Sequence, residues 1–373
     1  MIKHLRFVDA LRGVAASWVV LFHIWKRYYP ELSTHSHAFQ VPEILSWEFI
    51  VTFFTCQYGY IGVTLFFVLS GFCIHLPQAK KYLQTGRDQL VIKDFGKRRF
   101  WRLYPAYFAS VVFTAIAAHG FYPILLGIIK HQPVDIVAVM DLKGAFYNAF
   151  FLQQLSPKTL FFNGVYWTLL FEVQFYIFYP ALLWFMRRCG LGVVFCVLLG
   201  AEIGALFWKW PIDHFFITRY YEWFLGVLAA EWYVSGRCPI PSGVTALVGI
   251  FSGIGVTFIP LLWPYRDVLM ATGFLGLLMY FICAEIAHGE KSFQLPKFLD
   301  VFVPIGLFSY SLYLVHIPII DITWTGFKLA AKYGYISDGL ANTLSLIAIP
   351  IAFIFAYQFY FIFEKPFLQF KKK

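Results

Sequence analysis

The chain has 373 residues, of which 60% are hydrophobic and 21% aromatic, while only 13% are charged. Soluble domains usually carry about 25% charged residues, and a soluble fold of this size could not hide so much apolar surface. The net charge of +10 resembles that of nucleic-acid-binding proteins, but here the cations stand between long apolar runs and not on solvated faces. The composition therefore predicts an integral membrane protein that is surrounded by lipid and has no nucleic-acid partner.

Apolar runs long enough to cross a bilayer recur along the whole chain. A spanning helix needs about 20 mostly apolar residues, and about ten such runs are present. Their approximate ranges are 8–27, 52–76, 101–120, 164–186, 190–210, 217–234, 242–262, 267–287, 301–325 and 341–363. No small-residue cleavage site follows the first run, so we expect it to be retained as a span. The fold class predicted is all-α, a polytopic bundle of transmembrane helices that forms one membrane-embedded domain over residues 1–373.

The basic residues between the runs predict the orientation. The loop between the second and third runs is rich in cations, namely Lys80, Lys81, Arg87, Lys93, Lys97, Arg98 and Arg99. Cytoplasmic loops carry an excess of Lys and Arg, so this loop should be cytoplasmic. With about ten spans, Arg187, Arg188 and the lysines at 371–373 fall on the same side, and both termini are predicted to be cytoplasmic.

Residues 121–163 and the cysteines carry weaker signals. Two short apolar runs, 121–129 and 145–152, are predicted to be interfacial or re-entrant helices, and an extra pair of spans is the alternative. The six cysteines show no metal-ligand spacing and no disulfide framework. We expect them to be small buried apolar side chains, and we expect no metal cofactor.

Two ionisable side chains lie in the first run. Arg12 and His23 are separated by eleven residues, which is about 16 Å along a helix and about three turns, so they share a face. Arg12 should lie near the cytoplasmic end and His23 in the outer half. Such groups are costly in lipid and often functional. The structural alternatives are an interfacial arginine and a histidine that is bonded to a backbone carbonyl.

Other polar groups in the runs can likewise be interpreted as structural or as functional. Glu172 stands in an apolar run and must face a partner or a water-filled cavity, whereas Arg219 and Glu222 can pair on one helix face. Gly71 favours close helix packing. The arginines at 98, 99 and 102 can anchor a helix to anionic lipid, or they can offer bidentate donors to phosphates.

These residues resemble the motifs of the acyltransferase-3 family of membrane acyltransferases, which modify cell-surface glycans and other acceptors. The similarity runs in order from residue 5 to residue 366. The motifs are Arg12 to His23, Gly62 with Ser70-Gly71-Phe72, Arg99 and Arg102 with Pro105, Trp167 to Glu172 with Phe175-Tyr176, Arg219 with Glu222 and Gly226, Ser309-Tyr310 to His316, and Glu364 to Pro366. A single motif is weak, but the ordered set is specific.

The resemblance implies a set of roles for residues of this chain. The catalytic residues would be His23, Glu172 and Arg12. The acyl-CoA donor, expected to be acetyl-CoA, would be bound by Arg98, Arg99, Arg102 and Ser70. The acceptor would be bound by Asp9, Tyr310 and His316. Some members carry a fused extracytoplasmic hydrolase-like domain; we expect none here, so a second transfer step would need a separate extracytoplasmic partner.

The function expected is transfer of an acetyl or other acyl group from cytoplasmic acyl-CoA to a hydroxyl of a cell-surface carbohydrate or lipid-linked sugar, in a bacterial inner (cytoplasmic) membrane. An imidazole can serve as the general base for direct transfer, oriented by Glu172, or as a nucleophile that forms an acyl-histidine. The main alternative is a transporter or flippase for a lipid-linked sugar or small solute, because buried Arg, His and Glu suit it equally. A non-catalytic membrane scaffold is a third hypothesis.

Overall fold

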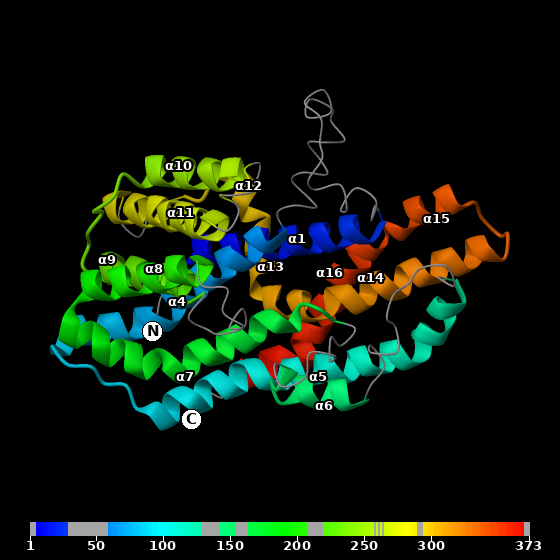
Figure 1. The fold of residues 1–373 in the computed structure, drawn as a ribbon, viewed down its shortest axis with the longest axis horizontal. Helices are drawn as coiled ribbons and strands as arrows, with labels where there is room; N and C mark the ends of the chain where they lie inside the picture. Colours follow the sequence, from blue (N-terminus) through cyan, green and yellow to red (C-terminus); the bar gives the residue numbers. More distant parts are fainter. Residues whose placement is uncertain are drawn as a thin grey trace. The chain divides into compact units, whose positions relative to one another are not determined.

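All the regular elements in the part of the chain that the structure describes are helices, as predicted. The computed structural model describes residues 5–28, 59–128, 142–153, 163–207, 219–256, 259, 262, 265–288 and 294–368. In chain order the helices are α1 (Arg6–Tyr28), α4 (Gly59–Thr85), α5 (Ile92–Ile128), α6 (Leu142–Ala149), α7 (Tyr166–Cys189), α8 (Leu191–Phe207), α9 (Tyr220–Val234), α10 (Ser242–Gly255), α11 (Arg266–His288), α12 (Lys297–Asp300), α13 (Phe302–Leu307), α14 (Ser309–Lys332), α15 (Asp338–Ser345), α16 (Ala348–Phe359), the π-helix η7 (Tyr360–Glu364) and α17 (Lys365–Leu368) (Figure 1).

Among the described residues, five helical segments are long and apolar enough to cross a membrane. They are Arg6–Arg27, Ile61–Thr85, Tyr166–Cys189, Arg266–His288 and Asp338–Leu368. The bent pair formed by α12–α13 and α14 is a sixth candidate. The prediction of a multi-pass membrane protein is therefore supported, whereas the larger number of spans and the cytoplasmic position of both termini stay predictions.

The ninth predicted span, 301–325, is not one straight helix. Its helices meet at a break between Leu307 and Ser309, where the axes bend by 77°. Phe308 lies between them with φ −113° and ψ 18°, outside the range of α-helical backbone angles. The apolar sequence is continuous through this point, so the hydropathy pattern carries no sign of the break.

The prediction for residues 121–129 is also wrong where the structure describes them. Residues 121–128 are the last turns of α5, which runs without interruption to Ile128, so they do not form a separate re-entrant helix. The second short run corresponds to α6, a short helix as expected. Residues 129–141 and 154–162 lie outside the described residues.

By their internal packing, the residues form two compact units. Unit 1 comprises Met1–Ala15, Tyr60–Gly96 and Phe171–Gly306, and unit 2 comprises Ala16–Gly59, Lys97–Leu170 and Leu307–Lys373. Helices α1, α5 and α7 each contribute residues to both units. The prediction of a single domain over residues 1–373 stays a prediction.

Glycines let the helices of unit 1 approach closely. A β-carbon at Gly71 of α4 would overlap the carbonyl oxygen of Trp223 on α9, and one at Gly226 of α9 would overlap the carbonyl oxygen of Val68. The contact between α10 and α11 is likewise formed through glycines. Small residues allow this kind of contact between helices in lipid, so the packing role predicted for Gly71 is confirmed.

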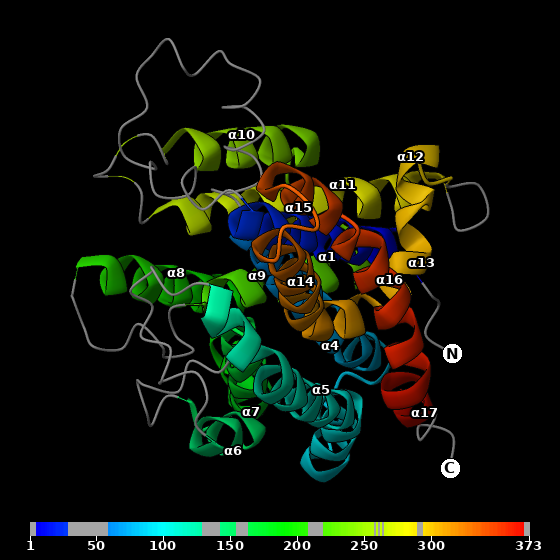
Figure 2. The same ribbon diagram turned by 90° about the vertical axis from the view of Figure 1, so that its right-hand side faces the viewer.

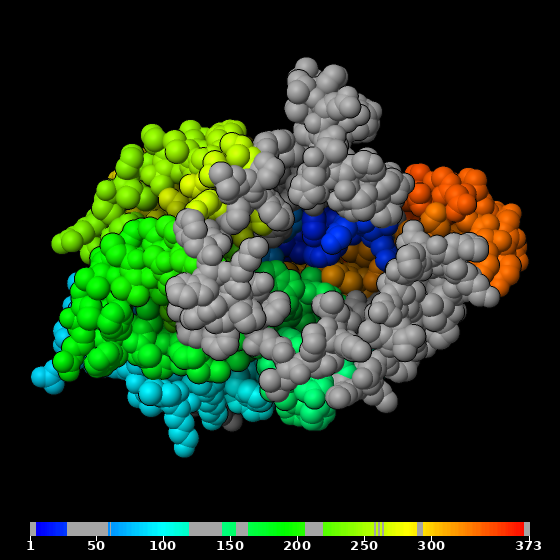
Figure 3. Space-filling view, in the orientation of Figure 1, coloured from blue at the N-terminus to red at the C-terminus, as the bar shows by residue number. Residues whose placement is uncertain are grey.

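The outward side of α10 is apolar. Its exposed large side chains are Val244, Leu247, Val248 and Phe251. In Figure 3 this helix is the yellow-green surface. A helix that presents such side chains outward suits contact with lipid better than contact with water, which agrees with the composition of the chain.

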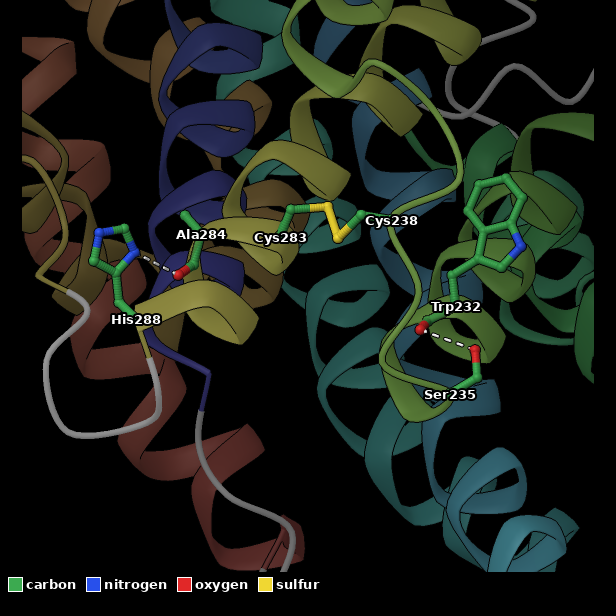
Figure 4. Close-up of a disulfide and its surroundings, with 6 residues drawn as sticks. All are labelled: Trp232, Ser235, Cys238, Cys283, Ala284 and His288. Carbon is green, nitrogen blue, oxygen red and sulfur yellow. Dashed lines mark hydrogen bonds between the residues drawn. A yellow bond between two sulfur atoms is a disulfide. The ribbon is translucent and has the colours of Figure 1, made fainter.

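Unit 1 also contains a disulfide that the sequence did not predict. Cys238, in the segment that follows α9, is bonded to Cys283 of α11 (Figure 4). Two other cysteines of this unit, Cys189 and Cys196, are exposed. The expectation that the cysteines are small buried side chains is therefore wrong for these four residues.

Helix α14 is the central element of unit 2. It packs against α15 and α16 (Figure 2). The Tyr310 hydroxyl donates to the carbonyl oxygen of Leu103 on α5 at 2.9 Å, and the Ser311 hydroxyl donates to the buried carboxylate of Glu364 in η7 at 2.6 Å. Polar groups of the first turn of α14 thus bind two neighbouring elements, which orients the residues that follow on the same helix.

Candidate active site

His23 lies beside His316 in unit 2. Nδ1 of His23 is 3.2 Å from Nε2 of His316, and the ring centroids are 5.0 Å apart. Nδ1 of His23 is also 2.9 Å from the carbonyl oxygen of Val19, and Nδ1 of His316 is 3.0 Å from that of Leu312. His316 is fully buried and His23 is half-buried. Two candidates that are 293 positions apart in the sequence are therefore in direct contact.

A second polar contact joins α1 and α14 next to the histidine pair. Arg27 Nε lies 2.9 Å from Asp321 Oδ1, and its guanidinium lies 4.5 Å from the centre of the Trp324 ring. Arg27 follows His23 by about one helical turn, and Asp321 follows His316 by a little more than one. The two contacts together hold α1 and α14 in one register. Asp321 was not among the residues predicted to be functional, although a carboxylate inside the apolar run 301–325 was a signal for it.

Polar groups before and at the start of α7 bind the second turn of α14. The Tyr313 hydroxyl lies 2.7 Å from Thr168 Oγ1, and the Asn163 amide donates to the carbonyl oxygen of Leu314 at 2.7 Å. The Tyr313 ring centre is 5.9 Å from that of His316. The residues that precede His316 on α14 are therefore held by hydrogen bonds, which helps to fix the position of its ring.

The arginines expected to bind the donor lie at the start of α5 in unit 2. Arg98 is exposed, and Arg99 and Arg102 are half-buried. Trp101, between them in the sequence, stacks on Phe367 of α17 with ring centroids 5.7 Å apart. Guanidinium groups at a partly exposed helix end can form bidentate hydrogen bonds with phosphates, so the geometry is compatible with the expected role.

Glu172 has its described partners in unit 1. One of its carboxylate oxygens accepts hydrogen bonds from the hydroxyls of Tyr176 and Ser70, the latter at 3.4 Å. The indole nitrogen of Trp223 lies 3.4 Å from the Ser70 hydroxyl oxygen. The structure thus brings together two predicted site residues, Ser70 and Glu172, and it supplies the partners that a carboxylate in an apolar run requires.

Arg12 belongs to the same part of unit 1. It is half-buried on α1, and its charge interacts with those of Asp9 and Glu172. Asp9 is itself buried, with 7% of its surface exposed. Because α1 is continuous, Arg12 and His23 are about 16 Å apart along one helix, as expected.

A buried histidine that sequence reasoning missed lies elsewhere in unit 1. Nδ1 of His75 is 2.9 Å from the Tyr179 hydroxyl, and Nε2 is 2.8 Å from a carboxylate oxygen of Glu231. Arg187 donates to the same oxygen at 2.9 Å and lies 3.3 Å from Asp88. These bonds join the ends of α4, α7 and α9, which agrees with the prediction that the loops after α4 and α7 share one side.

A network of charges joins α9 and α11 in unit 1. Arg219 Nη1 is 2.7 Å from Glu222 and 2.6 Å from Asp267, and Arg266 is 3.0 Å from Asp267. The local pair predicted from the sequence is therefore part of a larger network. Among the described residues the acids Glu202, Glu222 and Asp267 face two arginines here. One carboxylate oxygen of Glu222 and one of Glu202 are buried without a hydrogen-bond partner among the described residues.

Comparison with known proteins identifies the family of the chain. The acyltransferase-3 family model, described as "Acyltransferase domain", matches residues 5–363. The chain belongs to the acyltransferase-3 family. Membership confirms the resemblance seen in the motifs and the class of enzyme that it implied.

Relatives in this family are O-acetyltransferases by name. A Staphylococcus aureus (strain COL) protein named "Putative O-acetyltransferase SACOL0978" is 27% identical over 98% of this chain and 58% of its own length. The "Peptidoglycan O-acetyltransferase OatA" of Listeria monocytogenes is 27% identical over 86% of this chain and 50% of its own length. This chain therefore spans about half to three fifths of the length of these family members. No solved structure matches it.

Proposed function

We propose that this protein is a membrane O-acyltransferase that moves an acetyl or other acyl group from cytoplasmic acyl-CoA to a hydroxyl of a cell-surface carbohydrate or lipid-linked sugar. Its location would be the cytoplasmic membrane of a bacterium. The observation that carries the proposal is the half-buried imidazole of His23, which hydrogen bonds hold in a fixed orientation inside an apolar helix. A neutral imidazole has one ring nitrogen with a lone pair, which can take a proton from a hydroxyl group.

In the proposed reaction His23 acts as a general base. The imidazole removes the proton from the acceptor hydroxyl, and the resulting oxygen nucleophile attacks the thioester carbonyl carbon. A carbon–oxygen bond forms as the carbon–sulfur bond breaks, and the leaving thiolate takes the proton from the imidazolium. The acyl group ends on the sugar and free CoA is released, so the step needs no other reactant.

The remaining expected site residues have supporting roles in this proposal. Arg98, Arg99 and Arg102 would bind the phosphates of CoA, because phosphates favour bidentate guanidinium contacts. Glu172, with which Arg12 and Ser70 both interact in unit 1, would help together with them to bind the donor or stabilise charge during transfer. Asp9 and Tyr310 would contact the acceptor, a role that the resemblance suggests for His316 as well.

A glycan acceptor is supported by the names of the relatives, one of which is a peptidoglycan O-acetyltransferase. We also propose that, if the acceptor lies beyond the membrane, a separate extracytoplasmic transferase takes part in the delivery of the acyl group.

The test is transfer of label from acetyl-CoA that carries the label in its acetyl group. The purified protein in nanodiscs is incubated with this donor and a membrane glycan extract, and wild type is compared with His23→Ala. We expect the rate of transfer to fall by at least about 100-fold, because general base catalysis contributes 10²- to 10⁴-fold. The matched control is His288→Ala, which removes an exposed histidine at the end of α11 (Figure 4) and should leave the rate unchanged.

The outcomes separate the alternatives. Label in the glycan with wild type and His288→Ala, but not with His23→Ala, supports the proposal. Equal transfer by all three proteins would refute the role of His23. Stable label on the wild-type protein before acceptor is added would favour an acyl-histidine intermediate over direct transfer. If none of the three proteins binds or consumes acetyl-CoA, the result favours a transporter or flippase function.

A further inference from the structure

The hydrogen-bond partners around the histidine pair determine where its protons are. A backbone carbonyl oxygen can only accept a hydrogen bond, so each ring nitrogen that faces one must carry a hydrogen. Nδ1 of His316 faces the carbonyl oxygen of Leu312 at 3.0 Å. In the neutral ring only one nitrogen is protonated, so Nε2 of His316 has a lone pair.

The neighbours of His23 determine its proton position in the same way. Its Nδ1 lies 2.9 Å from the carbonyl oxygen of Val19 and 3.2 Å from Nε2 of His316. Both neighbours are acceptors, so Nδ1 of His23 carries the hydrogen and shares it between them. The hydrogen on Nδ1 of His23 thus faces the lone pair on Nε2 of His316. In neutral His23 the other ring nitrogen, Nε2, then has a lone pair. Within the described residues the hydrogen bonds of His23 all involve Nδ1.

We infer that His316 is a positioning residue for His23 and makes Nε2 of His23 the atom that takes the proton from the acceptor hydroxyl. This inference rests on the proposed function. His316 accepts the Nδ1 hydrogen of His23, holds the ring in one tautomer, and faces the imidazolium with a lone pair when His23 becomes protonated. A carboxylate performs this task in serine hydrolases, whereas here a neutral imidazole performs it.

The surroundings of His316 suit a positioning role. His316 is completely buried and its Nδ1 is bonded to the backbone of its own helix, so the ring cannot turn without breaking that bond. The hydroxyls of Thr168 and Tyr313 lie 2.7 Å apart, and both lie within hydrogen-bond distance of the carbonyl oxygen of Val165, at 2.9 Å and 3.3 Å. The ion pair between Arg27 and Asp321 then keeps α1 in register with α14.

A positioning role differs from the acceptor-binding role that the sequence suggested for His316. Loss of an acceptor contact raises the KM for the acceptor, whereas loss of a positioning residue lowers kcat. Two substitutions separate these roles. His316→Gln can place its amide oxygen near the position of Nε2 and so still accept the hydrogen bond. His316→Leu fills the space but has no acceptor.

The experiment combines kinetics with a direct measurement of the tautomer. The full chain is labelled with nitrogen-15 in its histidines, placed in nanodiscs, and studied by NMR as wild type, His316→Gln and His316→Leu. The resonances of His23 are identified as those lost in His23→Gln. We expect one tautomer of His23, with hydrogen on Nδ1, in wild type and His316→Gln, and a mixture in His316→Leu.

The kinetic arm measures transfer from labelled acetyl-CoA. We expect kcat to fall by about 10–100-fold in His316→Leu, as for other residues that orient a functional imidazole, and to recover most of that loss in His316→Gln. The KM values for donor and acceptor should change little. An equal kcat loss in both variants would overturn the inference, because it would mean that His316 itself transfers a proton. A rise in acceptor KM without a kcat loss would also overturn it.

The NMR arm keeps this inference separate from the proposed function. Hydrogen on Nε2 of neutral His23 in wild type would refute the positioning role of His316 even in an active acyltransferase. A wild type without any transferase activity, but with hydrogen on Nδ1 of His23 that becomes mixed in His316→Leu, would refute the proposed function and still support the arrangement of the pair.

Discussion

In unit 1 the buried polar groups are mainly charged, whereas those around α14 in unit 2 are mainly neutral. Unit 1 pairs Arg219 and Arg266 with Asp267, and Arg187 with Glu231. Unit 2 buries the imidazole of His316 and binds the hydroxyl of Tyr313 and the amide of Asn163. Burying a charge is costly unless it is paired, but a neutral group needs only its hydrogen bonds. We interpret these ion pairs of unit 1 as determinants of structure, and the histidine pair of unit 2 as the groups that are able to exchange protons.

The largest effect on stability is predicted for a substitution that removes a cation from the charge network of unit 1. Arg219→Leu would leave Glu222 and Asp267 without the cation that both contact. Removing one partner of a buried ion pair costs about 3–5 kcal/mol, so we expect a strong loss of thermal stability in detergent or a failure to accumulate folded protein. Thermal unfolding followed by size-exclusion chromatography would measure it.

The control for that prediction removes an acid from the same network. Glu202 is buried, and one of its carboxylate oxygens has no hydrogen-bond partner among the described residues. Glu202→Gln removes a negative charge where acids already outnumber arginines, so its stability should equal or exceed that of wild type. If Arg219→Leu unfolded no more easily than Glu202→Gln, the network would have no stabilising role.

A smaller effect on stability is expected at the close backbone contact between α4 and α9 in unit 1. Gly71→Ala would place a methyl group on the carbonyl oxygen of Trp223, so α4 and α9 would have to separate. Overpacking of this kind costs about 1–3 kcal/mol. Gly200→Ala in α8 is the matched control, because a β-carbon there meets open space and alanine favours a helix by about 1 kcal/mol. Thermal unfolding should move in opposite directions for the two variants.

The sequence predicted the features that depend on local pattern. Apolar runs located the helices, since a helix in lipid must be apolar along its length, and Gly71 was correctly assigned to close packing. The motifs from Arg12 to Glu364 indicated the family before any contact was known. Each of these signals lies within one segment or in the order of segments.

The features that the sequence did not predict depend on contacts between distant segments. His23 and His316 were both selected, but no local pattern indicates that their rings meet across 293 positions. The same holds for the bond between Cys238 and Cys283 and for the partners of His75. The break at Phe308 was missed for a different reason, because hydropathy is the same in a bent helix pair as in a straight one.

The smallest predicted effect on stability concerns the charged pair that stands beside the neutral histidines in unit 2. Asp321→Asn removes the carboxylate that faces Arg27 but leaves the contact between Arg27 and the Trp324 ring. The arginine is partly exposed, so we expect a loss of only about 1 kcal/mol. The control is Asp338→Asn, which breaks the exposed pair between Asp338 and Lys328 near the C-terminal end of α14.

These two variants should differ more in activity than in stability. If the pair between Arg27 and Asp321 holds α1 in register with α14, Asp321→Asn loosens the contact between His23 and His316, and small misplacements of catalytic groups are costly. We expect kcat for acetyl transfer to fall about tenfold, with no change in Asp338→Asn. Equal activity in both variants at equal stability would mean that the histidine pair keeps its geometry without the neighbouring charges, and that the neutral contacts of α14 are sufficient to position His23.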